Sequence, residues 1–121
     1  MANRRIGGLI ELKVDGQIYS AKGSFSYNIG TPKREMVVGS DSIHGFKEVP
    51  QVPMIEGVVT DNLDLDLRSL TEIKDATVSL RLANDKIVTL RDAVYTADGK
   101  VTTEEGEIEV RFEGLSADET A

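Results

Sequence analysis

The feature that most constrains the fold is an alternation of apolar and polar residues that recurs along most of the chain. It is clearest near the end, where Ile108, Val110 and Phe112 alternate with charged residues. Successive side chains of a β-strand point to opposite faces, so a period of two predicts strands with one buried face. The other segments with β-strand character are 10–14, 18–29, 54–60, 76–82 and 87–95. The chain is therefore predicted to be mainly β.

Turn signals separate these segments at short intervals. Asp15-Gly16, Asn84-Asp85 and Asp98-Gly99 are residue pairs that suit tight hairpin turns. The strand that begins at Val101 is expected to bulge at 103–106, and the tail after Gly114 is small, polar and expected to be loose. Six or seven antiparallel strands in this arrangement predict a β-sandwich or a partly open barrel.

One short helix is predicted at about 64–73. Leu67, Leu70 and Ile73 are spaced to lie on one helical face, and Asp64 or Asp66 can accept hydrogen bonds from the first free backbone N–H groups. The carboxylates at 61, 64 and 66 resemble part of a calcium loop, but the turn glycine and the bidentate glutamate are missing. Helix capping is the favoured interpretation of these aspartates.

Composition limits the classes of function. A length of 121 residues suits a single domain spanning 1–121, and no apolar run approaches the ~18 residues of a membrane span. The amino terminus also lacks a signal-peptide pattern. The absence of cysteine excludes disulfides, thiolate metal sites and cysteine nucleophiles, and a net charge of −7 disfavours binding to a phosphate backbone.

A long segment without alternation interrupts the strands. It is expected as an extended loop at about 31–53, and the irregular stretch 39–57, which overlaps this loop, contains three glycines and two prolines. Its apolar residues, too many for a solvated linker, are Ile43, Phe46, Val49, Val52, Met54 and Ile55. Loops of this length usually bind something or cap a site. We expect the loop to pack either on another molecule or back on its own domain.

Catalysis has weak support in the sequence. His44 is the only histidine, and no motif marks Ser40 or Ser42 as an activated nucleophile. The glutamates at 104, 105, 107, 109 and 113 could supply an acid/base pair for glycoside hydrolysis. The polar face of a strand is the favoured interpretation of them. No glycine-rich motif matches a phosphate-binding loop. No catalytic residue, metal site or cofactor is therefore predicted.

Four segments carry a family resemblance over nearly the whole chain in order. They are MANRRIGGLIELKVDGQIYSAKGSFSYNIG, GSDSIHGFKEVPQVPMIEGVVTD, LRSLTEIKDATVSLRLANDKIVTLRDA and GEIEVRFEG. They resemble the tail tube proteins of Mu-like contractile-tailed bacteriophages, and the pattern HGF-x-E-x-P-x-x-P-x-IEG is the most specific part. None of these motifs is catalytic.

The resemblance implies a structural subunit with the phage tail tube fold. Subunits of this kind form hexameric rings that stack into the inner tube of a contractile tail, and the lumen conducts DNA during infection. Implied partners are copies of itself, the sheath, baseplate and tail terminator proteins, and the tape measure protein and DNA in the lumen without specific binding. No membrane partner is implied. The expected location is the virion tail, assembled in the bacterial host cytoplasm.

Two sets of residues acquire roles from this resemblance. A long loop between early strands reaches the adjacent ring in tail tubes, which implies interface roles for Ile43, His44, Phe46, Val49, Pro50, Val52 and Pro53. An acidic lumen wall would let DNA slide, and the candidates for it are Ser24, Ser26, Asn28, Glu107, Glu109 and Glu113. For the serines and asparagine, an outer solvated face is an equal alternative. A tailocin or secretion-system tube is the alternative function.

Overall fold

The computed structural model describes residues 10–61, 63 and 65–120 of the chain. Within this part there are ten strands and one helix: β1 (Glu11–Val14), β2 (Gln17–Asn28), β3 (Lys33–Val38), β4 (Ile43–Val49), β5 (Met54–Thr60), α1 (Leu67–Thr71), β6 (Ala76–Arg81), β7 (Ile87–Tyr95), β8 (Val101–Thr102), β9 (Glu107–Glu113) and β10 (Ser116–Thr120). The mainly β composition with one short helix is confirmed.

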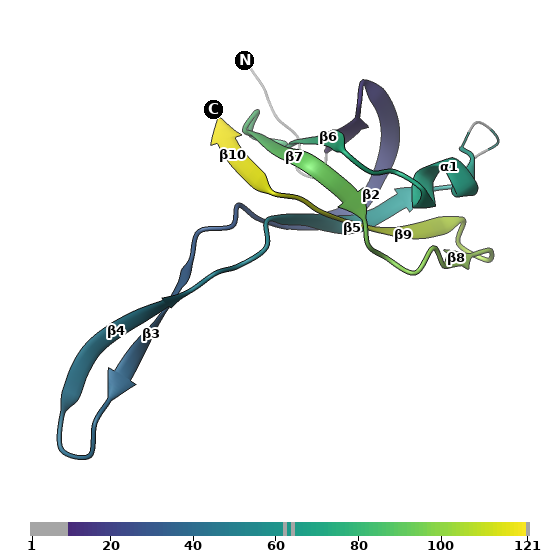
Figure 1. Cartoon of the computed structure of the whole chain (residues 1–121). Helices are drawn as coiled ribbons and strands as arrows, with labels where there is room; N and C mark the ends of the chain where they lie inside the picture. The colour runs from purple at the N-terminus through teal and green to yellow at the C-terminus, as the bar shows by residue number, and fades with distance from the viewer. Residues whose placement is uncertain (1–9, 62, 64, 121) are drawn as a thin grey trace.

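Six strands close an antiparallel barrel. The sheet runs β10-β7-β6-β1-β2-β5-β9-β8, and β7 also pairs with β9, which closes the ring β1-β2-β5-β9-β7-β6 (Figure 1). Closure depends on the long strand β2, whose first half pairs with β1 and whose second half pairs with β5. A register shift between Lys22 and Ser26 interrupts the pairing of β2 with β5. Such irregularities bend a strand and let a sheet curve into a barrel.

The barrel interior is an apolar core. Alternate residues of each barrel strand point inward, so that Leu12, Ile55, Leu80, Leu90 and Phe112 are fully buried. The ring of Phe112 also makes an edge-on contact with Tyr95, with centroids 5.6 Å apart. Leu70 of α1 is fully buried in the same cluster, so the helix covers part of the barrel. The predicted alternation therefore identified core positions of β1, β6 and β9, whereas for β7 only the strand itself was predicted.

Helix α1 is five residues long and lies inside the predicted range of 64–73. Asp66 is its N-cap: its carboxylate accepts hydrogen bonds from the Arg68 backbone N–H at 3.1 Å and from the Ser69 hydroxyl at 3.0 Å. The capping interpretation is thus confirmed for Asp66, whereas Asp64 lies outside the described residues. No helix in the described part of the chain is long and apolar enough to cross a membrane.

Two expectations for the end of the chain were wrong. The strand expected from Val101 with a bulge is two strands, β8 and β9, joined by a turn in which Gly106 has φ of +64°. The tail expected to be loose forms β10, which pairs with β7 along its whole length. Backbone pairing is available to polar residues as well as apolar ones, so the small polar composition of the tail did not prevent a strand.

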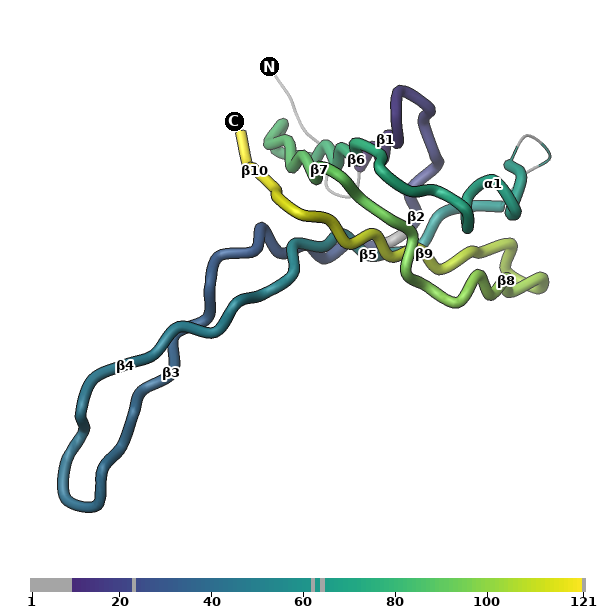
Figure 2. The backbone as a smooth tube through the Cα atoms, viewed as in Figure 1, coloured from purple at the N-terminus to yellow at the C-terminus, as the bar shows by residue number. Residues whose placement is uncertain are grey.

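The segment expected to be an irregular loop is an ordered hairpin. Strands β3 and β4 pair with each other from Lys33 to Val38 and from Ile43 to Val49, in a sheet separate from the barrel. Figures 1 and 2 show this hairpin projecting away from the barrel beyond the ends of β2 and β5. The period of two was obscured by a register shift between Val37 and Val38 and by Gly45, whose φ is +126°.

Candidate functional site

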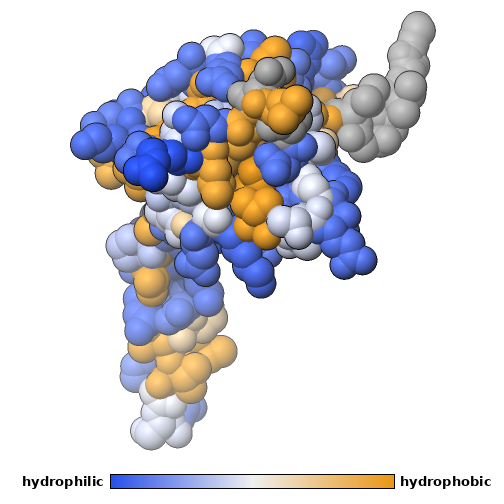
Figure 3. Space-filling model, turned by 90° about the vertical axis from the view of Figure 1, so that its right-hand side faces the viewer, coloured by the Kyte–Doolittle hydropathy of each residue, from blue (hydrophilic) through white to orange (hydrophobic). Residues whose placement is uncertain are grey.

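One face of the projecting hairpin is apolar. Met36 pairs with Phe46 and Val38 pairs with Ile43, and directly opposed residues of an antiparallel pair share a face. All four side chains are exposed, from 57% for Phe46 to 72% for Val38. Figure 3 shows these apolar colours on the hairpin well below the barrel. We call Met36, Val38, Ile43 and Phe46 the apolar face of the hairpin; no described residue buries any of these four side chains.

A cation marks the barrel-proximal end of this face. The Arg34 guanidinium lies over the Phe46 ring, 5.3 Å from its centroid, and forms an ion pair with Glu48 at 3.5 Å. Both partners of the ion pair are more than half exposed, so it contributes little to stability. The arginine therefore stiffens the position of the phenylalanine ring while remaining available for another carboxylate.

The opposite face of the hairpin is charged. Glu35 lies between two lysines, with its carboxylate oxygens 3.9 Å from Lys33 Nζ and 3.7 Å from Lys47 Nζ. Val49 pairs with Lys33 and Val37 pairs with Gly45 on this side. The hairpin thus has one apolar face and one mixed face, on which charged side chains lie beside the exposed Val37 and Val49.

The tip of the hairpin is shaped around His44. A Cβ atom added to Gly39 would lie 2.3 Å from His44 Nε2, so a larger residue at this position would displace the imidazole. The turn is closed by a hydrogen bond from the Gly39 N–H to the Ser42 carbonyl at 2.7 Å. His44, which was predicted for the interface, therefore lies against the turn at the distal end of the hairpin and is exposed.

The base of the hairpin is braced by polar contacts. Asn28 donates to the Gln51 side-chain oxygen at 3.1 Å, and Gln51 donates to the Thr31 carbonyl at 3.1 Å. The Gly30 N–H donates to Asn28 Oδ1 at 2.7 Å. Asn28, a candidate for the lumen wall, thus ties together the two chain segments that connect the hairpin to the barrel.

Glycine and proline complete the brace. A Cβ atom on Gly30, whose φ is +85°, would lie 2.6 Å from Pro53 Cγ. Pro53 is buried, and its carbonyl accepts a hydrogen bond from the Gly114 N–H at 3.1 Å. Of the predicted interface residues, Pro53 therefore packs inside its own subunit, whereas the other six are exposed: Ile43, His44, Phe46, Val49, Pro50 and Val52.

The remaining lumen candidates lie on one outer face of the barrel. Ser24, Ser26 and Glu109 line the same shallow hollow over β2, β5 and β9, together with Glu56 and Arg111. Strand pairing places Glu109 opposite Val58, Arg111 opposite Glu56, and Glu113 opposite Met54. We call the outward side of β2, β5 and β9 the acidic face, and the structure brings all six candidates to it or to its edge.

Cations partly neutralise the acidic face. Arg111 forms ion pairs with Glu56 at 2.6 Å and with Glu113 at 3.2 Å, and Lys22 forms one with Glu107 at 2.9 Å. The hydrogen bond from Lys22 lowers the pKa of Glu107, and the hydrogen bond to Glu56 raises the pKa of Arg111. Two cations thus face four carboxylates on these strands, and Glu109 has no ion-pair partner among the described residues.

Glu56 and Lys22 were missed by the sequence analysis. Neither belongs to the alternating glutamate row of 107–113, and their proximity to it depends on the β2-β5-β9 register. The IEG of the resemblance contains Glu56, but a sequence pattern gives no cross-strand partner. The face is therefore mixed in charge, because Lys22 and Arg111 lie among the glutamates predicted for an acidic wall.

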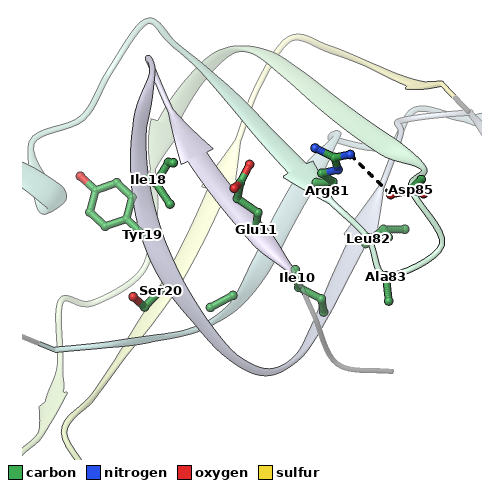
Figure 4. Close-up of a pocket in the computed structure, with 10 residues that line it drawn as sticks. Ile10, Glu11, Ile18, Tyr19, Ser20, Arg81, Leu82, Ala83 and Asp85 are labelled. Atoms are coloured by element: carbon green, nitrogen blue, oxygen red, sulfur yellow. Dashed lines mark hydrogen bonds and ion pairs between the residues drawn. The ribbon is translucent and has the colours of Figure 1, made fainter. Parts of the chain in front are cut away.

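A separate hollow of about 490 Å³ lies at the end of the barrel near β1 and the β6–β7 turn. Ile10, Ile18 and Leu82 supply apolar lining, and Arg81 forms an exposed ion pair with Asp85 at 3.5 Å (Figure 4). Figure 4 shows the Tyr19 hydroxyl pointing away from this ion pair. The lining offers no nucleophile held by a base, and no group of three or more metal-ligating residues occurs in the described part of the chain.

Comparisons with known proteins bear on the family and the fold of this chain. The family model described as "Phage tail tube protein" matches residues 3–119. No curated protein sequence matches the chain. Among solved structures, the chain is similar to one from the sheath/tube terminator of PVC, an extracellular contractile injection system, in the extended state. The TM-score is 0.65 and the sequence identity 11%, with all of both chains covered.

A second solved structure is the tube-terminating cap of the anti-feeding prophage, with a TM-score of 0.63 and 9% identity over all of this chain and 95% of that one. At these sequence identities the two structures support the fold alone. The family of the chain rests on the family match, which covers nearly the whole sequence. The tail tube family is structural, so the role is one of building a tube and not of catalysis, as the sequence predicted. The chain belongs to the phage tail tube protein family.

Proposed function

We propose that this protein is the repeating subunit of the inner tube of a contractile phage tail, where copies form hexameric rings that stack around a lumen. The observation that carries the proposal is the apolar face of the hairpin. Four large apolar side chains on a projection outside the barrel stay more than half exposed in the described part of the chain. Exposed apolar patches of this kind mark contacts with other proteins.

The braced base supports the same role. Gly30, Asn28, Gln51 and Pro53 hold the hairpin at one angle to the barrel, so little conformational freedom remains to be lost on docking. Ile43, His44, Phe46, Val49, Pro50 and Val52 are proposed to contact a neighbouring subunit, with Pro53 holding the connection from inside. The neighbour in the adjacent ring is the proposed contact.

The acidic face is proposed to line the lumen. Negative charge repels the DNA phosphates, and the ion pairs of Lys22 and Arg111 hold the glutamate side chains in place without making the wall basic. Glu109 is the carboxylate best placed to act on passing DNA. Replacing Glu109 with Lys should preserve tubes but slow DNA passage, and full infectivity of that variant would remove Glu109 from the lumen wall.

Two related functions are alternatives to a repeating subunit of a phage tail tube. The likeness to an extracellular contractile injection system favours a tailocin or secretion-system tube as the first alternative. Capsid and terminase genes beside the coding sequence would support a phage, and their absence a headless particle. The likeness to a terminator and a cap favours a subunit that ends a tube as the second alternative.

Negative-stain electron microscopy of the concentrated protein separates these structural roles. A repeating tube subunit forms stacks of rings with sixfold symmetry in end views. A terminator forms single rings that do not stack. Particles without a central lumen would contradict both roles. The sheath, baseplate, tail terminator and tape measure proteins are the proposed partners of the assembled tube.

A further inference from the structure

A hollow beside the junction of β9 and β10 offers exposed apolar side chains against which an apolar face could pack. It has a volume of about 380 Å³ and is lined by Asp75, Asp92, Val94, Glu113, Gly114 and Leu115. Leu115 is 80% exposed and Val94 is 38% exposed. Both are large aliphatic side chains, and both line this one hollow.

The backbone around this hollow is held firmly. The Leu115 N–H donates to the Arg91 carbonyl at 3.0 Å, and a Cβ atom on Gly114 would lie 2.5 Å from that same oxygen. The exposed leucine is therefore presented from a tightly packed crossing of β7 and β9–β10, not from a free loop. A preorganised apolar side chain of this kind loses little entropy when a partner covers it.

The charges of the hollow complement those of the hairpin. Asp75 and Asp92 are exposed and form no ion pair with the described residues, and Glu113 adds a third carboxylate beside them. On the hairpin, Arg34 lies at the edge of the apolar face, over the Phe46 ring, and its ion pair with Glu48 is exposed and weak. An arginine beside an aromatic ring therefore matches an aliphatic hollow bordered by carboxylates.

We infer that the hollow formed by Val94, Leu115, Asp75 and Asp92 receives the apolar face of the hairpin from a second copy of this chain. The hairpin points away from the barrel that carries its own hollow, so the occupant comes from another subunit (Figures 1 and 2). Phe46 covers Leu115 and Val94, and Arg34 exchanges Glu48 for Asp75 or Asp92. This inference rests on the proposed function, because it names the surface on which tube subunits meet.

The absence of cysteine makes a clean crosslinking test possible. Phe46→Cys protein and Leu115→Cys protein are prepared separately, mixed, assembled and oxidised, so that any disulfide must join two subunits. Phe46→Cys mixed with Ile18→Cys is the matched control, because Ile18 is also exposed, at 59%, but lines the hollow at the end of the barrel. Circular dichroism confirms that each variant is folded.

The expected result is a disulfide-linked dimer in assemblies of the first mixture and not of the second. Assemblies of normal length that lack the dimer in the first mixture, or that form it equally in both, overturn the docking surface while leaving the tube function intact. Failure of the wild-type protein to assemble contradicts the proposed function itself. As an independent measurement, Leu115→Asp should raise the concentration needed for assembly by about tenfold or more, and no change would contradict the inference.

Discussion

Replacing Phe46 with Asp should abolish tube formation while leaving the barrel folded. Phe46 lies on the apolar face of the hairpin, outside the barrel core, and is 57% exposed in the isolated subunit. The substitution therefore removes little from the stability of the monomer. It removes an apolar anchor from the proposed contact and places a carboxylate where the neighbouring surface carries Asp75 and Asp92.

The size of the effect follows from the exposed area. An aromatic side chain has about 200 Å² to bury, so a residue that is about half exposed leaves roughly 115 Å² to be covered by a partner. At about 25 cal/mol per Å², covering that area stabilises each contact by at most about 3 kcal/mol. Loss of this contribution corresponds to about a hundredfold in the association constant of each contact. Desolvation of the new carboxylate adds to the loss.

The assay is the critical concentration for assembly, measured by light scattering and by counting tubes in electron micrographs. Ile18→Asp is the control, because it changes the charge equally at an apolar residue that is 59% exposed at the end of the barrel. The thermal melting of both variants should match that of the wild-type monomer. If Phe46→Asp forms tubes at the wild-type concentration, the hairpin does not make the contact and the reasoning fails.

Three further predictions concern the base of the hairpin, the last strand and the core. Gly30→Ala should impair assembly more than Gly16→Ala: both glycines have φ near +85 to +88°, but only at position 30 would a Cβ collide with another residue, so equal effects on tube yield would argue against the brace. The hydrogen bond from Tyr27 lowers the pKa of Glu119, so its stabilisation exists above the carboxyl pKa of the unfolded chain and is lost as pH falls through the folded value. Tyr27→Phe should accordingly lower the melting temperature at pH 7 and approach the wild type in acid, and a constant difference from pH 7 to pH 3 would refute this. Phe112→Ala should destabilise the barrel by about 3–5 kcal/mol in urea unfolding, because Phe112 is fully buried, and a loss under 1 kcal/mol would contradict its core position.

The sequence predicted those parts of the fold in which burial alternates. In β9 the buried side chains are Ile108, Val110 and Phe112, as the period of two indicated. Such strands have one face in the core, so every second residue must be apolar, and this period of two can be seen in the sequence. A different signal, the Asp-Gly pair that suits a tight turn, located the hairpin turn at Asp15-Gly16, where both residues have positive φ.

The hairpin of β3 and β4 escaped prediction because no core imposes alternation on it. Both of its faces are exposed in the single chain, and its register shift and Gly45 break the remaining pattern. Its apolar residues predicted only that it packs on another molecule or on its own domain. Strand β10 was missed for a related reason, since it is held to β7 by backbone pairing that polar side chains do not reveal.

The candidate sites were predicted unevenly. The exposed positions of Ile43, Phe46 and Val52 agree with an interface, but the packing of Pro53 against Gly30 depends on contacts between separate segments. The glutamates of β9 were found from their alternation, whereas their neutralisation by Lys22 and Arg111 depends on the register of three strands. Cross-strand neighbours are set by the barrel, and one sequence does not specify them.

Sedimentation velocity of the wild-type protein over a range of concentrations tests the central claim most directly. If the apolar face of the hairpin joins subunits, large assemblies should appear as the total protein concentration rises. The concentration of the 121-residue monomer should then level off. Electron micrographs of the same samples should show rings or tubes. A strictly monomeric species at the highest concentration would contradict the account.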